Sequence, residues 1–417
     1  MEDKIKKIKN GSKAKRKGMV LVIAMVIMSM LLIVGFEMLT MVSNTRIRAV
    51  RNTQMISAGL AADAGAADAM KVLKDKLADE GPAWDTGDFP KSVGPVSLGC
   101  AYGNASYRYQ ITGSFSGGYQ IEATGVSGVF TRKVYSSIRA VGIFEYGILV
   151  NDFIGAQNNN IFKGWDSSNP GINHNEVFFN MGTLSIDDDS MTFGNGSEIF
   201  GNVFVGIGGE PDDVIDGCTI HGTTYSLTET IKTLTISAPS IYSPGGTLSV
   251  PKNGTVSITS DKMYNGITFS NGGKILIEGG NNVVLYIVND IDMNANNCEI
   301  KVQNDGSSLE LYLGGDLIAK NNSGFNNITT QFPERLKIFT VGSGIQTIQF
   351  KNNGDFYAAI YAPNAAVEFN NNGNVYGSIT ANSITTKNNL NFYYDQALRI
   401  VDVSQVTDFK VSRWRQE

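Results

Sequence analysis

The sequence predicts a mainly β protein that begins with one long helix, and three observations support this prediction. Glycine occurs 46 times and only 18% of the residues are charged, a composition typical of many short strands joined by turns. Residues 19–36 form an apolar run without any charge, and short repeats fill the second half of the chain. With 417 residues, 42% of them hydrophobic, the chain has enough apolar material for two or three domains.

Residues 1–18 form a basic leader. They hold eight lysines and arginines against Glu2 and Asp3, a net charge of +6, which leaves −11 for the rest of a chain whose total is −5. These positive residues outnumber Arg46, Arg48 and Arg51, which follow the apolar run. We therefore expect a single-pass protein of the inner or cytoplasmic membrane, with a cytoplasmic N-terminus and the C-terminal domain outside. No basic groove follows, so we expect no nucleic-acid partner.

Residues 19–80 are predicted to form one transmembrane and extended helix. Eighteen uncharged residues are close to the lower limit for crossing a bilayer, and residues 19–42 continue the apolar segment past Glu37. No proline occurs before Pro82, and residues 58–69 contain seven alanines. Such a helix is ~90 Å long. We expect residues 19–42 to contact lipid and the alanine-rich half to pack against another helix or a sheet.

The start of this helix resembles that of type IV pilin-like proteins. Lys17-Gly18-Met19 is similar to a prepilin peptidase site, with cleavage after Gly18 so that Met19 becomes the first residue. The stretches GMVLVIAMVIMSMLLIVGF and AADAGAADAMKVL resemble the N-terminal region of PilX-type pilus-assembly proteins. The resemblance implies a minor pilin that associates with other pilin-like subunits and with the pilus assembly machinery.

The fifth residue after the expected cut departs from the family pattern. Major pilins have a glutamate there, and this chain has Ile23. In the family that carboxylate is thought to pair with the free amino group of a neighbouring subunit. A buried ammonium without a partner is costly, and a subunit with Ile23 does not supply one. Ile23 therefore favours a place at a filament tip or in a priming complex.

Residues 81–144 are predicted to form a pilin-like β-meander. Apolar and polar residues alternate in three stretches between residues 105 and 142, which is the period of half-buried strands. Ser116-Gly117-Gly118 and Ser127-Gly128 supply the turns between them. A long helix followed by such a meander is the arrangement of a pilin head, in which the sheet covers the outer half of the helix.

Residues 145–400 are predicted to form a right-handed parallel β-helix. The stretch from Phe350 matches the stretch from Phe369 at an offset of nineteen, a third copy follows at seventeen, and Tyr286 repeats as Tyr312 at twenty-six. These offsets suit stacked coils of short strands. Asparagine supplies eleven of residues 351–391, since it tolerates left-handed corners and forms ladders. The handedness follows from the family likeness and from the preference for right-handed crossovers. The alternative is a β-sandwich.

The same segment resembles a domain of uncharacterised function that follows PilX-type N-termini in bacterial proteins. The residues that carry this resemblance are YAAIYAPN at 357–364, Val375-Tyr376-Gly377 and Tyr394-Asp395-Gln396-Ala397-Leu398. Residues 401–417 are predicted to form a C-terminal tail.

The search for catalytic and metal-binding residues gives little. His174 and His221 are the only histidines, and no nucleophile, phosphate or dinucleotide motif occurs. We therefore expect no enzyme, cofactor or metal. The acidic segments are interpreted as solvated turns rather than calcium sites. These segments are Asp187-Asp188-Asp189 and Asp212, Asp213 and Asp216.

Three cysteines permit at most one intramolecular bridge. Cys100, Cys218 and Cys298 have no metal-binding spacing, so we interpret them as small buried side chains. A bond between Cys218 and Cys298 is the alternative for a chain outside the cytoplasm.

Aromatic residues recur in the repeats, and they suggest two interpretations. Packing between coils is the more common reason for such alignment, and a sugar-binding strip on an outer face is the other. The residues are Tyr286, Tyr312, Phe339, Tyr357 and Tyr376.

The sequence thus predicts a non-enzymatic, pilin-like structural subunit of a type IV pilus or related secretion filament. One alternative is a membrane-anchored extracellular adhesin that binds glycans or surfaces. A polysaccharide-degrading β-helix enzyme is the other alternative, and it would need a catalytic group among scattered lysines: Lys274, Lys301, Lys320, Lys351 and Lys387.

Overall fold

The computed structural model divides the chain into two compact units, and each is described by itself. The first, which we call the head unit, comprises Met1–Asp75, Asp85–Ile138 and Val411–Glu417, and the second, the coil unit, comprises Lys76–Trp84 and Arg139–Lys410. The structure describes side chains from residue 19 onward. The residues described are 2–80, 89–99, 104–114, 117–169, 177, 179–241, 244–326, 331–342, 344–351, 355–370, 373–399 and 406–417.

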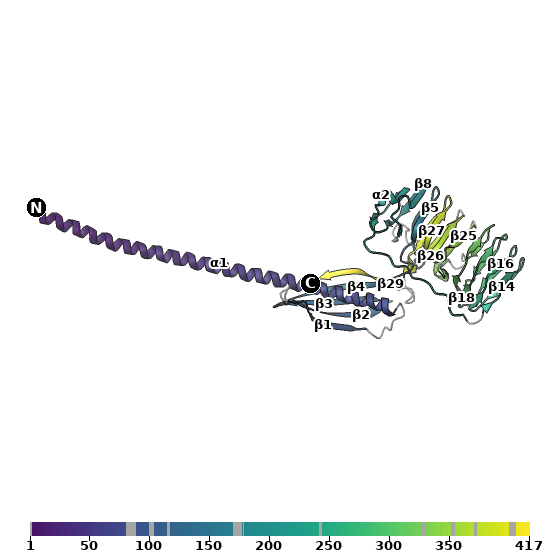
Figure 1. The fold of residues 1–417 in the computed structure, drawn as a ribbon, viewed down its shortest axis with the longest axis horizontal. Coiled ribbons are helices and arrows are strands. Elements are labelled where there is room, and N and C mark those ends of the chain that lie inside the picture. Colours follow the sequence, from purple (N-terminus) through teal and green to yellow (C-terminus); the bar gives the residue numbers. More distant parts are fainter. Residues whose placement is uncertain are drawn as a thin grey trace. The chain divides into compact units, whose positions relative to one another are not determined.

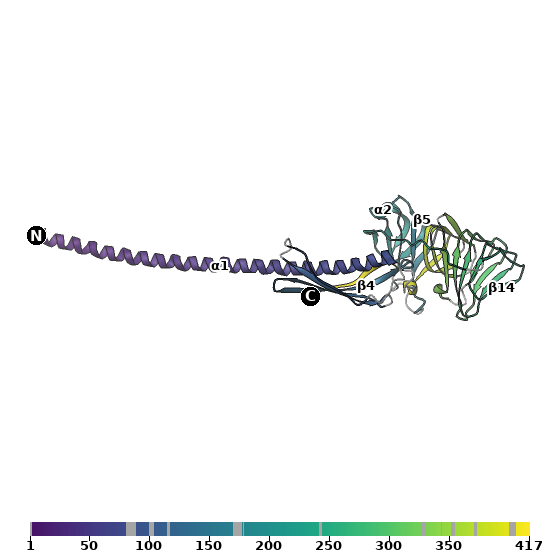
Figure 2. The same ribbon diagram turned by 60° about the horizontal axis from the view of Figure 1, so that its bottom comes forward.

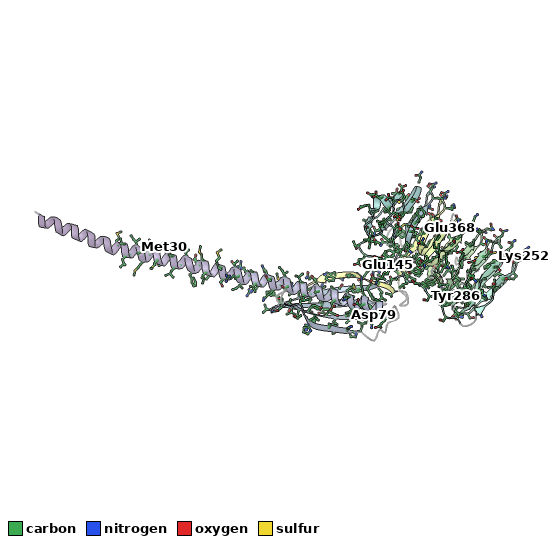
Figure 3. All side chains as sticks on the ribbon, viewed as in Figure 1. Met30, Asp79, Glu145, Lys252, Tyr286 and Glu368 are labelled. Carbon is green, nitrogen blue, oxygen red and sulfur yellow. The ribbon has the colours of Figure 1, made fainter. Side chains whose placement is uncertain are left out.

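Helix α1 (Glu2–Glu80) is continuous, as predicted for residues 19–80 (Figure 1). Residues 19–53 of this helix are exposed, and the side chains around Met30 project away from the helix (Figure 3). The hydroxyl groups of Ser29 and Thr40 donate hydrogen bonds to carbonyls three residues earlier, at 2.9 and 2.8 Å. Such internal bonds satisfy polar side chains where no water is available. By length and composition, Met19–Glu80 qualifies as a membrane-spanning helix.

An antiparallel sheet packs on the second half of α1 (Figure 2). Its strand order is β1-β2-β3-β4-β29, and the predicted meander is confirmed for β1 to β4. The strands are β1 (Lys91–Ser97), β2 (Ser106–Ser114), β3 (Gly118–Ser127), β4 (Phe130–Gly142) and β29 (Val406–Gln416).

Strand β29 comes from the segment that we expected to be a C-terminal tail. It returns to the head sheet, where Lys133 and Glu417 exchange backbone hydrogen bonds of 2.9 and 2.8 Å. From Lys410 onward its side chains are exposed on both faces. The apolar–polar alternation that identifies half-buried strands is therefore missing from most of β29, which explains why the sequence pattern did not reveal it.

Small residues allow the helix and the sheet to approach closely. Ala58 and Ala62 are fully buried, and they face Gly125 of β3. A Cβ atom at Gly125 would lie 2.1 Å from the Ala58 carbonyl oxygen, so only glycine fits there. The Tyr107 hydroxyl donates a 3.1 Å hydrogen bond to Asp68 of α1. The alanine-rich half of α1 thus packs against a sheet.

The coil unit consists of parallel strands stacked in coils. It contains a 20-stranded sheet and a 4-stranded sheet, β14-β17-β20-β23, and its strands pair in parallel from one coil to the next. The mainly β fold and the coils are therefore confirmed, and the antiparallel pairing of a β-sandwich is excluded. The strands are β5 (Ile148–Ala156), β6 (Ile161–Trp165), β7 (Asn180–Thr183), β8 (Met191–Phe200), β9 (Asn202–Val205), β10 (Ile215–Ile220), β11 (Thr224–Ser226), β12 (Pro244–Gly245), β13 (Leu248–Val250), β14 (Thr255–Ile258), β15 (Lys262–Tyr264), β16 (Ile267–Phe269), β17 (Lys274–Ile277), β18 (Asn282–Ile287), β19 (Ile291–Met293), β20 (Glu299–Val302), β21 (Ser308–Leu313), β22 (Leu317–Ala319), β23 (Gly324–Asn326), β24 (Leu336–Thr340), β25 (Gln346–Phe350), β26 (Phe356–Phe369), β27 (Asn374–Thr386) and β28 (Asn391–Asp395).

Among the described residues, the coil unit also contains the short helical segments α2 (Pro211–Val214), η4 (Pro333–Arg335) and η5 (Gln396–Arg399).

The order of the coils in space differs from their order in the sequence. The first half of β27 pairs with β28 and its second half pairs with β5, so strands from the beginning and the end of the unit share one coil. From β5 the coils proceed through β8 to β10 and β11. Residues 227–241, which we call the strap, then lead toward β12, from which the coils return to β28.

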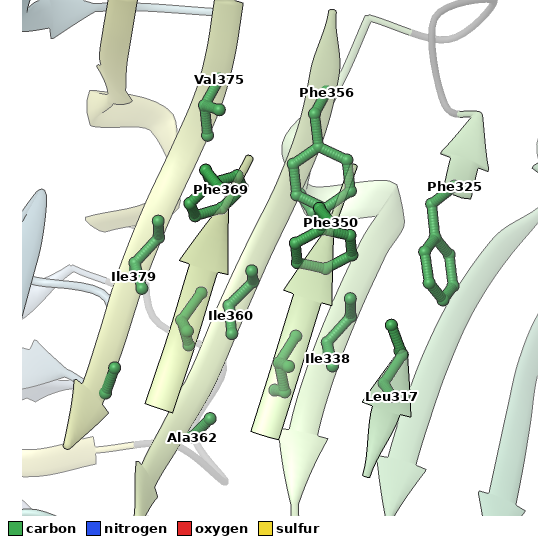
Figure 4. Close-up of a cluster of buried hydrophobic side chains, with 14 of the residues drawn as sticks. Leu317, Phe325, Ile338, Phe350, Phe356, Ile360, Ala362, Phe369, Val375 and Ile379 are labelled. Carbon is green, nitrogen blue, oxygen red and sulfur yellow. The ribbon is translucent and has the colours of Figure 1, made fainter. Parts of the chain in front are cut away.

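Columns of apolar side chains fill the coils. In Figure 4, Ile338, Ile360 and Ile379 occupy paired positions on the neighbouring strands β24, β26 and β27, and each is buried. Residues that match in the sequence repeats are register partners on neighbouring strands. Tyr286 pairs with Tyr312, Tyr357 with Tyr376, and Tyr376 with Tyr393. Each coil therefore buries its apolar residues against the next one.

Asparagine has the two roles that its abundance predicted. Asn159, Asn297 and Asn389 adopt positive φ angles of 53–60° at corners, where asparagine is tolerated better than most residues. The Asn391 amide donates a 2.9 Å hydrogen bond to the side-chain oxygen of Asn374 in the neighbouring coil. Within residues 351–391, Asn389 thus serves as a corner, and Asn374 and Asn391 form part of a ladder.

Candidate functional site

The predicted processing and assembly residues lie in the bare part of α1. Gly18, Met19 and Ile23 belong to one helical stretch, and the side chains of Met19 and Ile23 are 67% and 51% exposed. Cleavage after Gly18 remains a prediction.

The interpretation of a bond between Cys218 and Cys298 is wrong, because both thiols are free. Cys218 lies in β10 at one end of the stack, whereas Cys298 directly precedes β20 in the part that follows the strap. Burial, followed by the charge of Asp216, raises the pKa of the Cys218 thiol to about 11. Cys100 and His174 lie outside the described residues.

The acidic segments meet through the backbone, where the amide of Asp189 donates a 3.1 Å hydrogen bond to the carbonyl of Asp213. Within the described ranges, no group of three or more histidine, cysteine or carboxylate side chains has the arrangement of a metal site. Among the scattered lysines, Lys274 pairs with Glu299 at 3.1 Å.

The aromatic repeats form two separate columns, and the strap covers the first. Tyr286, Tyr312 and Phe339 occupy equivalent positions on neighbouring strands, and the column continues to Tyr361. Phe339 is only 1% exposed and stacks on Tyr312 at 5.0 Å. Leu234 of the strap packs on this column, and the Tyr361 hydroxyl bonds both the amide and the carbonyl of Leu234, at 2.5 and 3.1 Å. These rings are packing elements.

The second column forms a ladder of stacked rings. Tyr357 and Tyr376 stack at 4.5 Å with planes 5° apart, and Tyr376 and Tyr393 stack at 4.6 Å with planes 11° apart. Lys163 of β6 occupies the position next to Tyr393, and Phe200 of β8 occupies the position next to Lys163. Phe200 and His221 then continue the ladder with ring centres 4.2 Å apart. Tyr376 has a ring on each face, and the Lys163 ammonium lies 5.3 Å from the ring centre of Tyr393. A sugar stacks on an open ring face, which Tyr376 does not offer.

A buried ion cluster joins the segment that enters the coil unit to the segment that leaves it. Glu145, 4% exposed, accepts hydrogen bonds of 2.6 and 2.8 Å from Arg139 and one of 3.1 Å from Arg399. Burial alone would raise the pKa of Glu145, but the hydrogen bonds and charges of both arginines outweigh burial and hold the pKa below its ordinary value. Figure 3 labels Glu145 within the unit.

A cavity of about 270 Å³ lies beside this cluster, and all of its lining residues belong to the coil unit. Tyr146 and Leu149 line one wall, and Leu227 and Ile231 of the strap pack against the same two residues. The Lys410 ammonium donates a 2.8 Å hydrogen bond to the Tyr146 hydroxyl and lies 5.1 Å from the ring centre. Burial, followed by the charge of Glu145, raises the pKa of Tyr146 to about 12.

Sequence reasoning missed this cavity. Its walls come from residues 141–149, Asn180, residues 225–233, Tyr361 and residues 407–410, which no local spacing connects. The far end of the ladder has a signal in the sequence, because Ile199-Phe200 recurs as Ile220-His221, and Ile199 pairs with Ile220 in the structure.

Comparison with known proteins gives a partial picture. The model of a domain of unknown function (DUF7305) matches residues 279–401, which are less than half of the chain. No curated protein matches the chain.

Two solved structures are distantly similar. The competence-associated pilin ComZ from Thermus thermophilus matches with a TM-score of 0.27 and 11% identity, over 87% of this chain and 98% of that one. An ice-binding protein DUF3494 domain from Shewanella frigidimarina matches with a TM-score of 0.21 and 12% identity, over 60% of this chain and 94% of that one. At these values neither match assigns a function.

Proposed function

We propose that this protein is a non-enzymatic, pilin-like structural subunit of a type IV pilus or related secretion filament. The observation that carries the proposal is the bare apolar half of α1, which continues without a break into the half that holds the head sheet. An apolar surface of this extent is unstable in water, at roughly 25 cal/mol per Å², so lipid or other helices cover it. Because the helix is continuous, the lipid or the helices that bind residues 19–42 also anchor the head unit.

The sequence around the start of the apolar run supports processing and a special position. Lys17-Gly18-Met19 provides the expected peptidase site. Ile23 supplies no carboxylate for a neighbouring N-terminus, so the subunit belongs at the tip of a filament or in a priming complex rather than along its length. Its partners are other pilin-like subunits and the assembly machinery. The coil unit is then displayed outside the cell.

The mass of the mature chain tests this proposal. Intact-mass spectrometry of protein from its native membrane is expected to give a chain that begins at Met19. A Gly18→Glu variant, which puts a bulky charge at the cut, is expected to keep Met1. Recovery of the wild type with residues 1–18 attached would contradict processing, and labelled protein spread evenly along filaments would contradict the tip position.

The cavity of the coil unit favours a second candidate function. A membrane-anchored protein that binds extracellular glycans needs a cavity with ring faces and hydroxyl groups, and Tyr146, Tyr225 and the strap threonines line this one. This candidate keeps α1 as a plain anchor. The mature N-terminus separates the two, because an anchor without processing retains residues 1–18.

A further inference from the structure

The walls of the cavity combine supported aromatic rings with an apolar floor. Buried Phe204 lies behind both tyrosines, with ring centres 5.1 Å from Tyr146 and 6.1 Å from Tyr225. Both tyrosines border the cavity, together with Leu149. Tyr146 is only 7% exposed, since Phe204 packs against it and the Lys410 ammonium lies 5.1 Å from its ring centre, whereas the Tyr225 ring is 37% exposed. A flat apolar face of a ligand can therefore pack against Tyr225.

Hydrogen-bonding groups surround the same space. Thr228, Thr230 and Thr233 of the strap line it with exposed hydroxyl groups. The side-chain oxygen of Asn180 is buried, and no described residue donates a hydrogen bond to it. A buried acceptor without a donor costs about 1–3 kcal/mol, which a ligand hydroxyl would recover. The cavity thus suits a ligand with an apolar face and several hydroxyl groups.

The charges around the cavity are balanced. Lys232 and Lys410 line it together with Glu229 and Asp408, two positive and two negative side chains. Balanced charge gives no preference for an anion or a cation, so a neutral ligand fits best. The volume of about 270 Å³ is just below the usual range for small-molecule sites, roughly 300–1,000 Å³. A ligand of about one sugar ring is the appropriate size.

We propose that this cavity binds one neutral pyranose ring of a saccharide, with the exposed ring of Tyr225 against the ring's C–H face and Asn180, Lys410 and the strap threonines on its hydroxyl groups. The inference rests on the second candidate function and gives it a site. It does not depend on filament assembly, because no residue of α1 takes part.

Saturation-transfer NMR on the full-length chain tests the site. The protein is held in a detergent without a sugar head group, and glucose, galactose, mannose and N-acetylglucosamine are added one at a time. We expect saturation of the ring C–H protons of at least one of them. Tyr225→Ala removes a ring face and is expected to weaken binding about tenfold, which is the effect of ~1.4 kcal/mol. Thr230→Val, which replaces a hydroxyl at nearly constant size, is expected to weaken it several-fold.

Tyr286→Ala is the matched control, since it removes a half-buried tyrosine of the covered column outside the cavity. It is expected to leave binding unchanged. The proposal is wrong if none of the four sugars receives saturation, if Thr230→Val and Tyr225→Ala bind as well as wild type, or if glucuronic acid binds more tightly than the neutral sugars. Each of these results leaves the mass of the mature N-terminus unaffected, so failure of the site and failure of the filament proposal are distinguishable.

Discussion

At the scale of single residues, close contact in the head unit depends on one glycine. Gly125 of β3 lies against the backbone of α1, where a Cβ would approach the Ala62 amide nitrogen to 2.4 Å. The backbone of a packed helix has little room to shift, and overpacking of this kind costs about 1–3 kcal/mol. A small change at Gly125 therefore acts on the whole joint between helix and sheet.

Gly125→Ala is expected to destabilise the head unit by about 1–3 kcal/mol. Thermal unfolding followed by circular dichroism measures the effect as a lower Tm. Gly117→Ala serves as the control in the same unit, since its Cβ would meet only the Ser114 hydroxyl at an ordinary 3.4 Å. Equal Tm values for the two variants would contradict the close-packing argument.

The Glu145 cluster makes the stability of the coil unit depend on pH. Because the pKa of Glu145 is held below its ordinary value of 4.5, its ion pairs stabilise the fold above that value. The stabilisation is lost as the pH falls through the lowered pKa. Glu145→Gln leaves Arg139 and Arg399 without a counter-charge, and removal of one partner from a buried pair costs about 3–5 kcal/mol.

Urea unfolding of wild type and Glu145→Gln at pH 7 is expected to differ by about 3 kcal/mol. The difference should shrink as the pH falls from the ordinary value of 4.5 through the lowered pKa, because Glu145 takes up a proton first in the unfolded chain and then in the folded protein. Lys274→Gln, which disrupts a more exposed ion pair, is the control and should change stability by less than about 1 kcal/mol. A difference that stays constant with pH would exclude the ion pairs as its cause.

At the scale of elements, the strap holds one aromatic column in place. Tyr361 is the central contact, because its hydroxyl pairs with both backbone groups of Leu234. The strap has no regular strand pairing of its own in the described range 227–241. Its order therefore depends on the contacts that its own apolar side chains make with the coils. These side chains are Leu227, Ile231, Leu234 and Ile236.

Tyr361→Phe is expected to loosen the strap while the coils stay intact. The lost hydrogen bonds cost about 1–2 kcal/mol, so exchange of the Leu234 amide should accelerate about tenfold. Hydrogen exchange measured by mass spectrometry detects this. Tyr286→Phe is the control and should leave the strap peptide unchanged.

The elements also show how far the sequence could predict the fold. The offsets of twenty-six, nineteen and seventeen residues became strand registers because a coil must align equivalent apolar residues with its neighbour. The strap and the cavity depend on contacts such as Tyr361 with Leu234, which are 127 residues apart and leave no periodic signal. The repeated aromatic residues could be recognised in the sequence. Only the structure shows which rings stack on one another and which line the cavity.

At the scale of the whole molecule, most of the coil unit lies in the sequence between β4 and β29, which are neighbours in the head sheet. The sheet is therefore complete only when the last residues of the chain are present. Removal of residues 411–417 is expected to expose β4 and to speed exchange of the Lys133 amide, which bonds to Glu417. Hydrogen exchange of β4 measures this, with a polar tag added after Glu417 as the control. Unchanged protection of β4 would contradict a structural role for β29.

Because strands from the beginning and the end of the segment Arg139–Lys410 share one coil, the chain enters and leaves this segment within the stack of coils rather than at an end. Residues 141–143, Thr407, Asp408 and Lys410, close to these two points, also line the cavity. A ligand fixed to a surface would thus pull on the two tethers almost directly, and the tension would bypass the stacked coils. The hydrogen bonds between coils would then be spared the unzipping force that attachment at either end would impose.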